Sequence, residues 1–215
     1  MYNKRTFGKG MGASIGLLAV IALLIISTGS AYAVPLAGIG GFTIQADQLT
    51  AESAYIYPGV DDTSNQDAYP MAVIEQKDVK IDGMKLMKSL DVSAVPGLSG
   101  SARVVMTSSD TVTADQQMVK VSNIEADTAE FNQQVIDESN SNNPSDQFGI
   151  WAGDASKNQD KLQDGKIVDI SGDGPAQKLQ GANIKAHYLA SSSISIPGLS
   201  LQVQYDQDGD GQYNE

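Results

Sequence analysis

The stretch Phe42-Thr43-Ile44-Gln45-Ala46-Asp47-Gln48-Leu49 decides the predicted fold, because its pattern recurs along the chain. The pattern is an isoleucine, a small residue two positions later, and leucine or alanine three positions after that. In a β-strand, residues two positions apart lie on the same face, and a small residue there lets another layer approach closely. Each copy is therefore predicted to be a strand that bends and continues as a second strand. The further copies are Ile81-x-Gly83-x-x-Leu86, Ile124-x-Ala126-x-x-Ala129 and Ile184-x-Ala186-x-x-Leu189.

Proline–glycine pairs follow three of the copies and predict turns. Proline sets φ for such a turn, and glycine supplies the positive φ that a type II turn needs. Units that cannot bury their own apolar face are expected to stack, and the uneven spacing of the copies argues against a regular solenoid. We therefore predict an all-β fold, an elongated twisted β-sheet stack or β-roll after an N-terminal signal helix. The alternative is that short β motifs resemble one another by chance. The pairs are Pro58-Gly59, Pro96-Gly97 and Pro197-Gly198.

Two parts of the chain lack the strand-like alternation of apolar and polar residues. Residues 128–139 are the one helix candidate, with a weak apolar stripe formed by Ala129, Val135 and Ile136. Residues from about 138 to 181 are dominated by Asn, Ser, Asp, Gln and Gly, which predicts a polar insertion at the surface. The only tryptophan, Trp151, is expected to pin this insertion to the core, and an exposed binding platform is the alternative.

The first 33 residues predict export. A basic head precedes an uncharged apolar run, and small side chains at Ala31 and Ala33 suit signal peptidase. This reading makes residues 1–33 a signal peptide and Val34 the first residue of the mature chain. The basic head consists of Lys4, Arg5 and Lys9.

Two other readings of the N-terminus stay open. The uncharged stretch is long enough to span a bilayer, so it is also a candidate for a retained anchor. Lys9-Gly10 before Met11 is similar to an archaeal prepilin cleavage site, after which the apolar helix would form a filament core. All three readings place the rest of the chain outside the cytoplasm. That remainder is predicted to be one β-rich domain, residues 34–205, followed by an acidic tail, residues 206–215.

The charge balance narrows the choice of partners. The chain carries 26 acidic and 14 basic residues, a net charge of −12, and none of the acidic residues lies in the predicted signal peptide. Such a surface repels nucleic acid and anionic lipid, so we expect no nucleic-acid partner. It suits a host that lives in high salt, where counterions screen the repulsion, and it suits divalent cations. A solvated acidic surface is the simplest interpretation.

No catalytic motif stands out. The chain has no cysteine, which excludes thiol nucleophiles and cysteine metal sites. Gly97-Leu98-Ser99-Gly100-Ser101 departs from the G-x-S-x-G elbow at its last position. The single histidine, His187, falls inside the fourth copy of the repeat and is expected on a strand face rather than beside Ser99 as a base. We therefore predict a protein that is not an enzyme.

The C-terminal tail is the one candidate metal site. It has Asp at loop positions 1, 3 and 5 and Gly at position 6, the opening of a calcium loop. The acidic ligand of position 12 is missing. The sequence therefore predicts weak calcium binding, with an acidic solvated tail as the alternative. The candidate ligands are Asp206, Asp208, Asp210, Gln212 and Asn214.

The leader, the stretch Gly41-Phe42-Thr43-Ile44-Gln45-Ala46-Asp47-Gln48-Leu49, the following aromatic-Pro-Gly-Val-Asp segment and Ser195-Ile196-Pro197-Gly198-Leu199-Ser200-Leu201 carry a family resemblance. Together they resemble an uncharacterised family of exported β-rich proteins, a domain of unknown function found in actinobacteria with relatives in salt-loving archaea. The resemblance implies export, a single β-rich domain and a small membrane protein as a partner. It supplies no catalytic residues, and the acidic C-terminal loop is an addition to the family pattern.

Two functions remain as hypotheses. The first is an exported cell-surface binding or interaction protein, with an apolar groove for a lipid-like hydrophobic ligand. The second is a structural subunit of a surface fibre or pilus-like assembly. In that case unpaired edge strands would drive self-association, and residues 34–42 could donate a strand.

Overall fold

The computed structural model describes residues 40–63, 66–92, 99–153, 174–208 and 210–213. The chain divides into two units, and all of these residues belong to the second, Ala33–Glu215. The predicted signal peptide, residues 1–33, lies outside the described residues. Within the described residues, no helix has the length and apolar character needed to cross a membrane.

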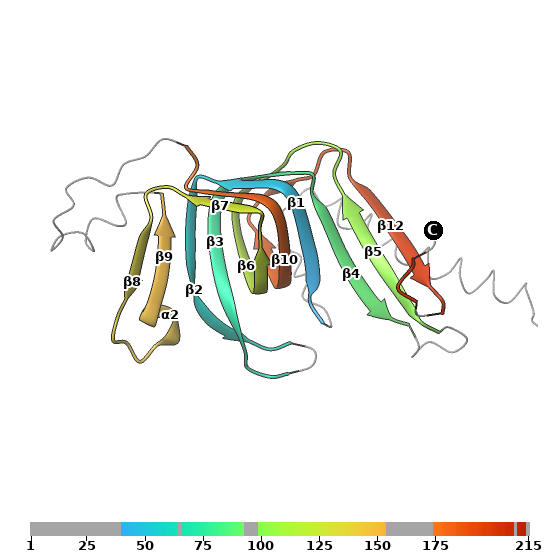
Figure 1. Ribbon diagram of the computed structural model, residues 1–215, viewed down its shortest axis with the longest axis horizontal. Helices are drawn as coiled ribbons and strands as arrows, with labels where there is room; N and C mark the ends of the chain where they lie inside the picture. Colours follow the sequence, from blue (N-terminus) through green and yellow to red (C-terminus); the bar gives the residue numbers. More distant parts are fainter. Residues whose placement is uncertain (1–39, 64–65, 93–98, 154–173, 209, 214–215) are drawn as a thin grey trace, which may run out of the picture. The chain divides into compact units, whose positions relative to one another are not determined.

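The described chain is almost entirely β-structure, which confirms the predicted fold class (Figure 1). Its strands form one sheet of twelve strands, and every pairing is antiparallel. The order is β12-β5-β4-β1-β10-β6-β3-β2-β9-β8, while β11 pairs with β6 and β7 with β10. The elements are β1 (Phe42–Ala51), β2 (Ser53–Asp61), β3 (Tyr69–Asp82), β4 (Lys85–Asp91), β5 (Ser101–Thr107), β6 (Val112–Glu125), β7 (Thr128–Phe131), β8 (Val135–Glu138), α2 (Pro144–Gln147), β9 (Phe148–Ala152), β10 (Gln177–Ser191), β11 (Ile194–Ser195) and β12 (Ser200–Asp206).

Four strands close on one another and supply most of the core. β1 pairs with β10, β10 with β6, β6 with β3, and β3 again with β1. This closed set of pairings leaves none of the four as a free edge. Their buried side chains form one hydrophobic cluster, together with Met84 just before β4 and Leu86 in β4. Burial of this apolar surface is the main stabilising contribution. The cluster is Phe42, Ile44, Ala46, Leu49, Ala51, Ile74, Val79, Ile81, Met84, Leu86, Val112, Ala114, Val119, Val121, Leu179, Ala182, Ile184 and Ala186.

The repeated motif marks the bends of the sheet, as predicted for the copies that begin at Ile44, Ile81 and Ile124. In β1 the alternation of buried residues shifts after Ala46, so that Leu49 is the next buried position. In the copies that begin at Ile81 and Ile124, the chain leaves one strand and begins the next near the small residue of the motif: β3 is followed by β4, and β6 by β7. Glycine is required where two bends meet. Gly83 has a φ of +63°, and a Cβ there would lie 2.1 Å from Oδ2 of Asp47.

The fourth copy behaves differently. Ile184 and Ala186 are buried in β10, and the pairing with β6 shifts on either side of Ala186 instead of breaking the strand. The main bend of β10 lies earlier, at Gly181, whose φ is +59° and whose added Cβ would lie 2.2 Å from Oδ2 of Asp127. At both glycine bends, therefore, an aspartate side chain from another segment lies against the glycine: Asp47 against Gly83 and Asp127 against Gly181.

One predicted turn was wrong. Pro58 and Gly59 lie inside strand β2, opposite Ala72 and Met71 of β3. β9 pairs with β2 only as far as Ile56, so the missing N–H of Pro58 costs no ladder bond on that side. Among the other pairs, Pro197-Gly198 is a turn, with a φ of +58° at the glycine, and Pro96-Gly97 lies outside the described residues.

The predicted helix at residues 128–139 was also wrong, because this segment forms strands β7 and β8. Ala129 lies opposite Leu179 of β10, and Val135 lies opposite Trp151 of β9. The weak helical stripe gives way because distant strands offer backbone partners and apolar contacts that an isolated helix of this length would lack.

The sheet extends into residues 138–181, the range predicted as a polar insertion. β9 and the first residues of β10 lie within it, while residues 154–173 lie outside the description. Trp151 is half-buried and attaches β9 to β2, because its ring stacks on Tyr55 with 4.5 Å between centroids. Tyr55 in turn lies 4.7 Å from the ring of Tyr57. A ring face covered in this way is not available as a binding platform.

Three buried glutamines link strands β3, β6 and β10 of the closed set. The side-chain Nε2 of Gln117 donates to Oε1 of Gln76 at 2.7 Å, and Nε2 of Gln76 donates to Oε1 of Gln177 at 2.5 Å. All three side chains are buried, and Gln177 is only 1% exposed. These bonds offset the cost of removing the amides from water.

Candidate functional site

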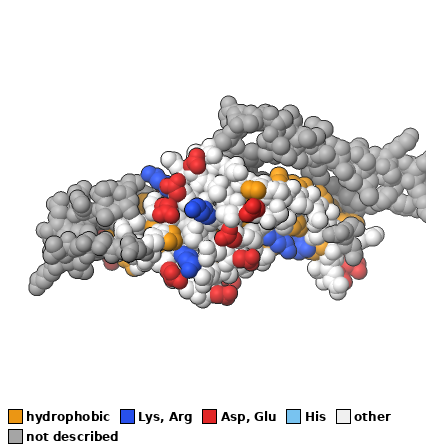
Figure 2. Space-filling model, turned by 90° about the horizontal axis from the view of Figure 1, so that it is seen from above, with side chains coloured by type: hydrophobic (Ala, Val, Ile, Leu, Met, Phe, Trp, Pro, Cys, Tyr) orange, Lys and Arg blue, Asp and Glu red, His pale blue; other side chains and the backbone are white. Residues whose placement is uncertain are grey.

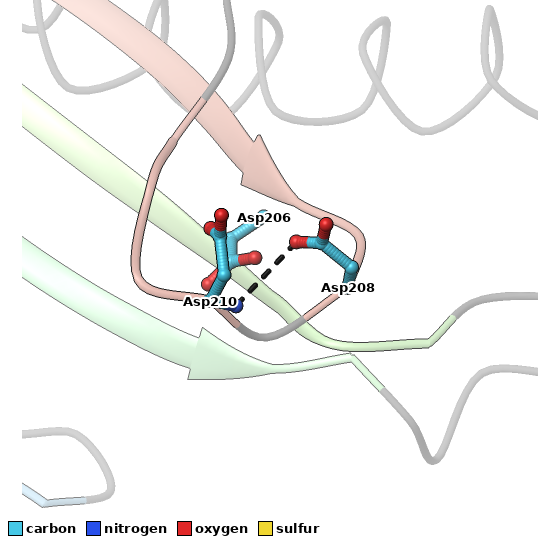
Figure 3. A group of neighbouring side chains, drawn as sticks. All are labelled: Asp206, Asp208 and Asp210. Carbon is cyan, nitrogen blue, oxygen red and sulfur yellow. Dashed lines mark hydrogen bonds between the residues drawn. The ribbon is translucent and has the colours of Figure 1, made fainter.

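The C-terminal loop brings three predicted calcium ligands together. Asp206 is buried at the end of β12, Asp208 and Asp210 are exposed, and one carboxylate oxygen from each lies within 4.8 Å of the others (Figure 3). Backbone N–H groups order the loop around them. Gly211 donates to Oδ2 of Asp206 at 3.0 Å, and Gln212 donates to Oδ1 of Asp210 at 2.7 Å.

This arrangement fits part of the coordination that calcium requires. Calcium takes six to eight oxygen ligands, and glycine at loop position 6 provides the sharp turn. Gly211 occupies that position with a φ of +83°. Gln212 lies at position 7 of the same loop, whereas Asn214 lies outside the described residues. Three converging carboxylates suit a hard divalent cation, and further ligands would have to come from carbonyl groups or water.

The loop is fixed against strand β5. The hydroxyl groups of Tyr213 and Ser101 lie 2.9 Å apart, and the guanidinium of Arg103 lies 4.0 Å from the centroid of the Tyr213 ring. The hydrogen bond with Ser101 is the main cause of a lowered pKa at Tyr213. Gly100, with a φ of +80°, lets the chain pass, since a Cβ there would lie 2.0 Å from the backbone oxygen of Asp206.

Ser99 and His187 have separate partners. The hydroxyl of Ser99 donates to the backbone oxygen of Gln207 at 3.1 Å, while Nε2 of His187 lies 2.9 Å from Oγ of Ser122. Burial lowers the pKa of His187, and repulsion from Lys185 and Lys88 lowers it further. The lowered pKa of His187 therefore reflects its burial first and the nearby positive charges of Lys185 and Lys88 second.

Sequence reasoning missed a polar pocket that is lined in part by Lys185. It has a volume of about 270 Å³ and is open to solvent. Its charged residues, Arg103 of β5 and Lys185 of β10, lie on strands that are separated by β4 and β1, so no local sequence motif predicts the pocket. The lining residues are Gly40, Gly41, Thr43, Met87, Ser89, Arg103 and Lys185.

A second surface missed by the sequence is the apolar face of strands β4, β5 and β12, here called the wing face. Cross-strand pairing aligns Leu86, Met106 and Leu201 in one row, from buried through half-buried to 43% exposed. The next row runs from Lys88 through Val104 to Val203, which is 44% exposed. The core surface thus continues outward to the end of the sheet.

Searches of curated proteins and of solved structures find no match. One protein family, described as "Family of unknown function (DUF6230)", matches residues 40–210. This range covers most of the chain and nearly all of the described sheet, in agreement with the resemblance to an uncharacterised family. The chain therefore belongs to the DUF6230 family of unknown function.

Proposed function

We propose that this chain is an exported, non-enzymatic binding protein of the cell surface, and that its wing face binds a lipid-like hydrophobic ligand. The basic head, apolar run and small cleavage residues of positions 1–33 support export. The resemblance to exported proteins of actinobacteria and salt-loving archaea supports the same location, and it supports a membrane-protein partner.

The exposed apolar rows of the wing face carry the ligand proposal. Soluble proteins rarely leave a continuous apolar patch without a use, whereas single exposed apolar residues are ordinary. Leu201 and Val203 are continuous with the core through Met106 and Leu86, so they are not isolated. An acyl chain laid on this face would remove both side chains from water.

Native mass spectrometry of the protein from its own host tests the proposal. We expect a chain that starts at Val34 and carries an additional mass of a few hundred daltons, roughly that of a small ligand. The double variant Leu201→Gln and Val203→Gln should bind a fluorescent fatty acid at least about tenfold more weakly. Full burial of each side chain contributes about 1.5–3 kcal/mol, and the ligand would bury only the part that is still exposed in the free protein.

The matched control is Val60→Gln, since Val60 is 54% exposed on β2 and lies outside the wing face. Its affinity for the fatty acid should equal that of the wild type. A wild-type protein that binds neither fatty acid nor extracted host lipid would contradict the proposal.

A structural subunit of a surface assembly is the second candidate, and the contrast between the two ends of the sheet favours it. β8 is short and ends in Asp137 and Glu138, charges that discourage pairing at an edge. β12 is longer, and its only charged residue, Asp206, is buried. Strand β12 is therefore the end suited to pairing with a second copy.

Symmetry gives this pairing a testable register. Antiparallel pairing centred on Val203 overlaps the whole of β12 and sets Leu201 opposite Tyr205 of the second copy. Because the chain has no cysteine, Val203→Cys should form an intermolecular disulfide in an oxidising buffer, visible as a dimer without reductant. Ile136→Cys on β8 is the control and should stay monomeric. Monomeric Val203→Cys at high protein concentration and high salt would refute this register.

We also propose that the C-terminal loop binds calcium weakly, on the support of its three converging carboxylates. Calcium at tenfold its dissociation constant should raise the free energy of unfolding by about 1.4 kcal/mol, a rise of about 3–6 °C in melting temperature. Asp208→Asn should abolish the rise, and Asp115→Asn, exposed on β6, should retain it. An equal rise with both variants would show a general salt effect.

A further inference from the structure

The face of the sheet opposite the wing face carries several basic residues around the pocket described above. One row runs from Lys185 of β10 through Thr43 to Met87, and the next contains Gln45 and Lys85. Beyond them, Ser89 of β4 lies opposite Arg103 of β5, followed by Gln204 of β12. Carboxylates border these rows, since Glu125 pairs with Asn183, and Asp91 and Asp206 flank Ser101. Acidic groups also predominate in the view of Figure 2, whereas the lining of the pocket contains two cations and no carboxylate.

The pocket described above lies on this face, and its polar groups are held in place. Nε and an amino nitrogen of Arg103 donate to Oε1 of Gln204 at 3.1 and 2.7 Å, while the ring of Tyr213 lies against the guanidinium. Lys185 borders the same pocket, and the hydroxyl groups of Thr43 and Ser89 add neutral donors. A guanidinium held in place beside a lysine ammonium is an arrangement that recognises oxyanions.

The lining of the pocket includes no carboxylate. The ion pairs of Lys120 with Asp61 and of Lys178 with Glu130 involve neither Lys185 nor Arg103. The mutual repulsion is felt nearby, because Lys185 contributes to the lowered pKa of Lys88, after burial. Two like charges that line one pocket repel each other in the free protein, and a bound anion would relieve that repulsion.

We propose that this pocket binds the phosphate group of a small soluble molecule. The volume of about 270 Å³ suits a small ligand, and two cations with two hydroxyl donors match a group that carries two charges and several acceptor oxygens. The net charge of −12 disfavours approach to an acidic bilayer, which is why we assign a soluble source. The assignment is independent of the wing face, which lies on the other side of the same strands.

Isothermal titration of the protein as produced by its host, with inorganic phosphate at constant ionic strength, tests this site. We expect saturable binding of one phosphate per chain that sodium chloride does not reproduce. Lys185→Gln should weaken it about tenfold or more, the scale of one charge-assisted hydrogen bond, and Lys185→Arg should restore it. Lys178→Gln removes the same charge from the same strand at a residue paired with Glu130, and it should leave phosphate affinity unchanged.

Three results would overturn the assignment. The first is phosphate binding no stronger than that of chloride, and the second is equal weakening by Lys185→Gln and Lys178→Gln. The third uses phosphatidylcholine vesicles with and without phosphatidic acid. Binding to the acidic vesicles alone, with no binding of inorganic phosphate, would replace the soluble ligand by a membrane headgroup.

Discussion

Gln76→Leu is expected to lower the free energy of unfolding by about 2–5 kcal/mol. Gln76 stands in the middle of the buried amide chain, where it accepts from Gln117 and donates to Gln177. Leucine has a similar volume but offers neither bond, so two buried polar groups lose a partner, at about 1–3 kcal/mol each. Urea denaturation followed by circular dichroism measures the loss.

Two further variants separate lost hydrogen bonds from altered packing. Gln116→Leu changes the neighbouring exposed side chain on β6 and should shift stability by less than about 0.5 kcal/mol. Leucine at positions 76, 117 and 177 together should recover part of the loss, because replacing all partners by apolar groups leaves no orphaned amide. A triple variant less stable than Gln76→Leu would show that shape, rather than hydrogen bonding, limits this region.

Phe42→Ala is expected to cost about 3–5 kcal/mol of unfolding free energy. Phe42 opens β1, is 1% exposed, and lies opposite Ala186 in the closed set of strands. Alanine removes the whole ring and leaves a cavity that the paired backbones on either side cannot collapse to fill. Denaturant titration with the fluorescence of Trp151, the only tryptophan, reports the change.

Phe148→Ala is the matched control, since Phe148 is 42% exposed on β9. It should cost less than about 1 kcal/mol, and Phe42→Leu should fall between the two because the cavity is smaller. Equal losses at positions 42 and 148 would mean that the ring of Phe42 contributes no more than a surface phenylalanine.

Part of the fold could be predicted because short segments of the sequence carry a local pattern of apolar and small residues. The alternation at Ile44 and Ala46 shows which face is buried, and the small residue two positions on locates a bend. The clustering of Asp206, Asp208 and Asp210 could be predicted for the same reason, since they follow one another in a single loop.

The remainder depends on partners that are distant in sequence. Ala129 becomes part of a strand only because Leu179 lies opposite, and Gln76 is buried only because Gln117 and Gln177 satisfy its amide. Pro58 fits inside β2 because β9 ends its pairing before reaching it. None of these conditions leaves a local pattern of composition or spacing.

The pairing of β1 with β10 also sets the order in which the molecule can assemble. β1 spans Phe42–Ala51 and finds one of its neighbours only at Gln177–Ser191, so it must wait for nearly the whole chain. To form contacts between residues this far apart, the chain must first lose the conformational entropy of a long loop, before any apolar surface is buried. Proteins dominated by such contacts fold in milliseconds to seconds. In a nascent chain that ends before Gln177, β1 and β6 would be joined only through β3. Each would keep the edge that β10 covers in the complete sheet, exposed to pairing with other chains.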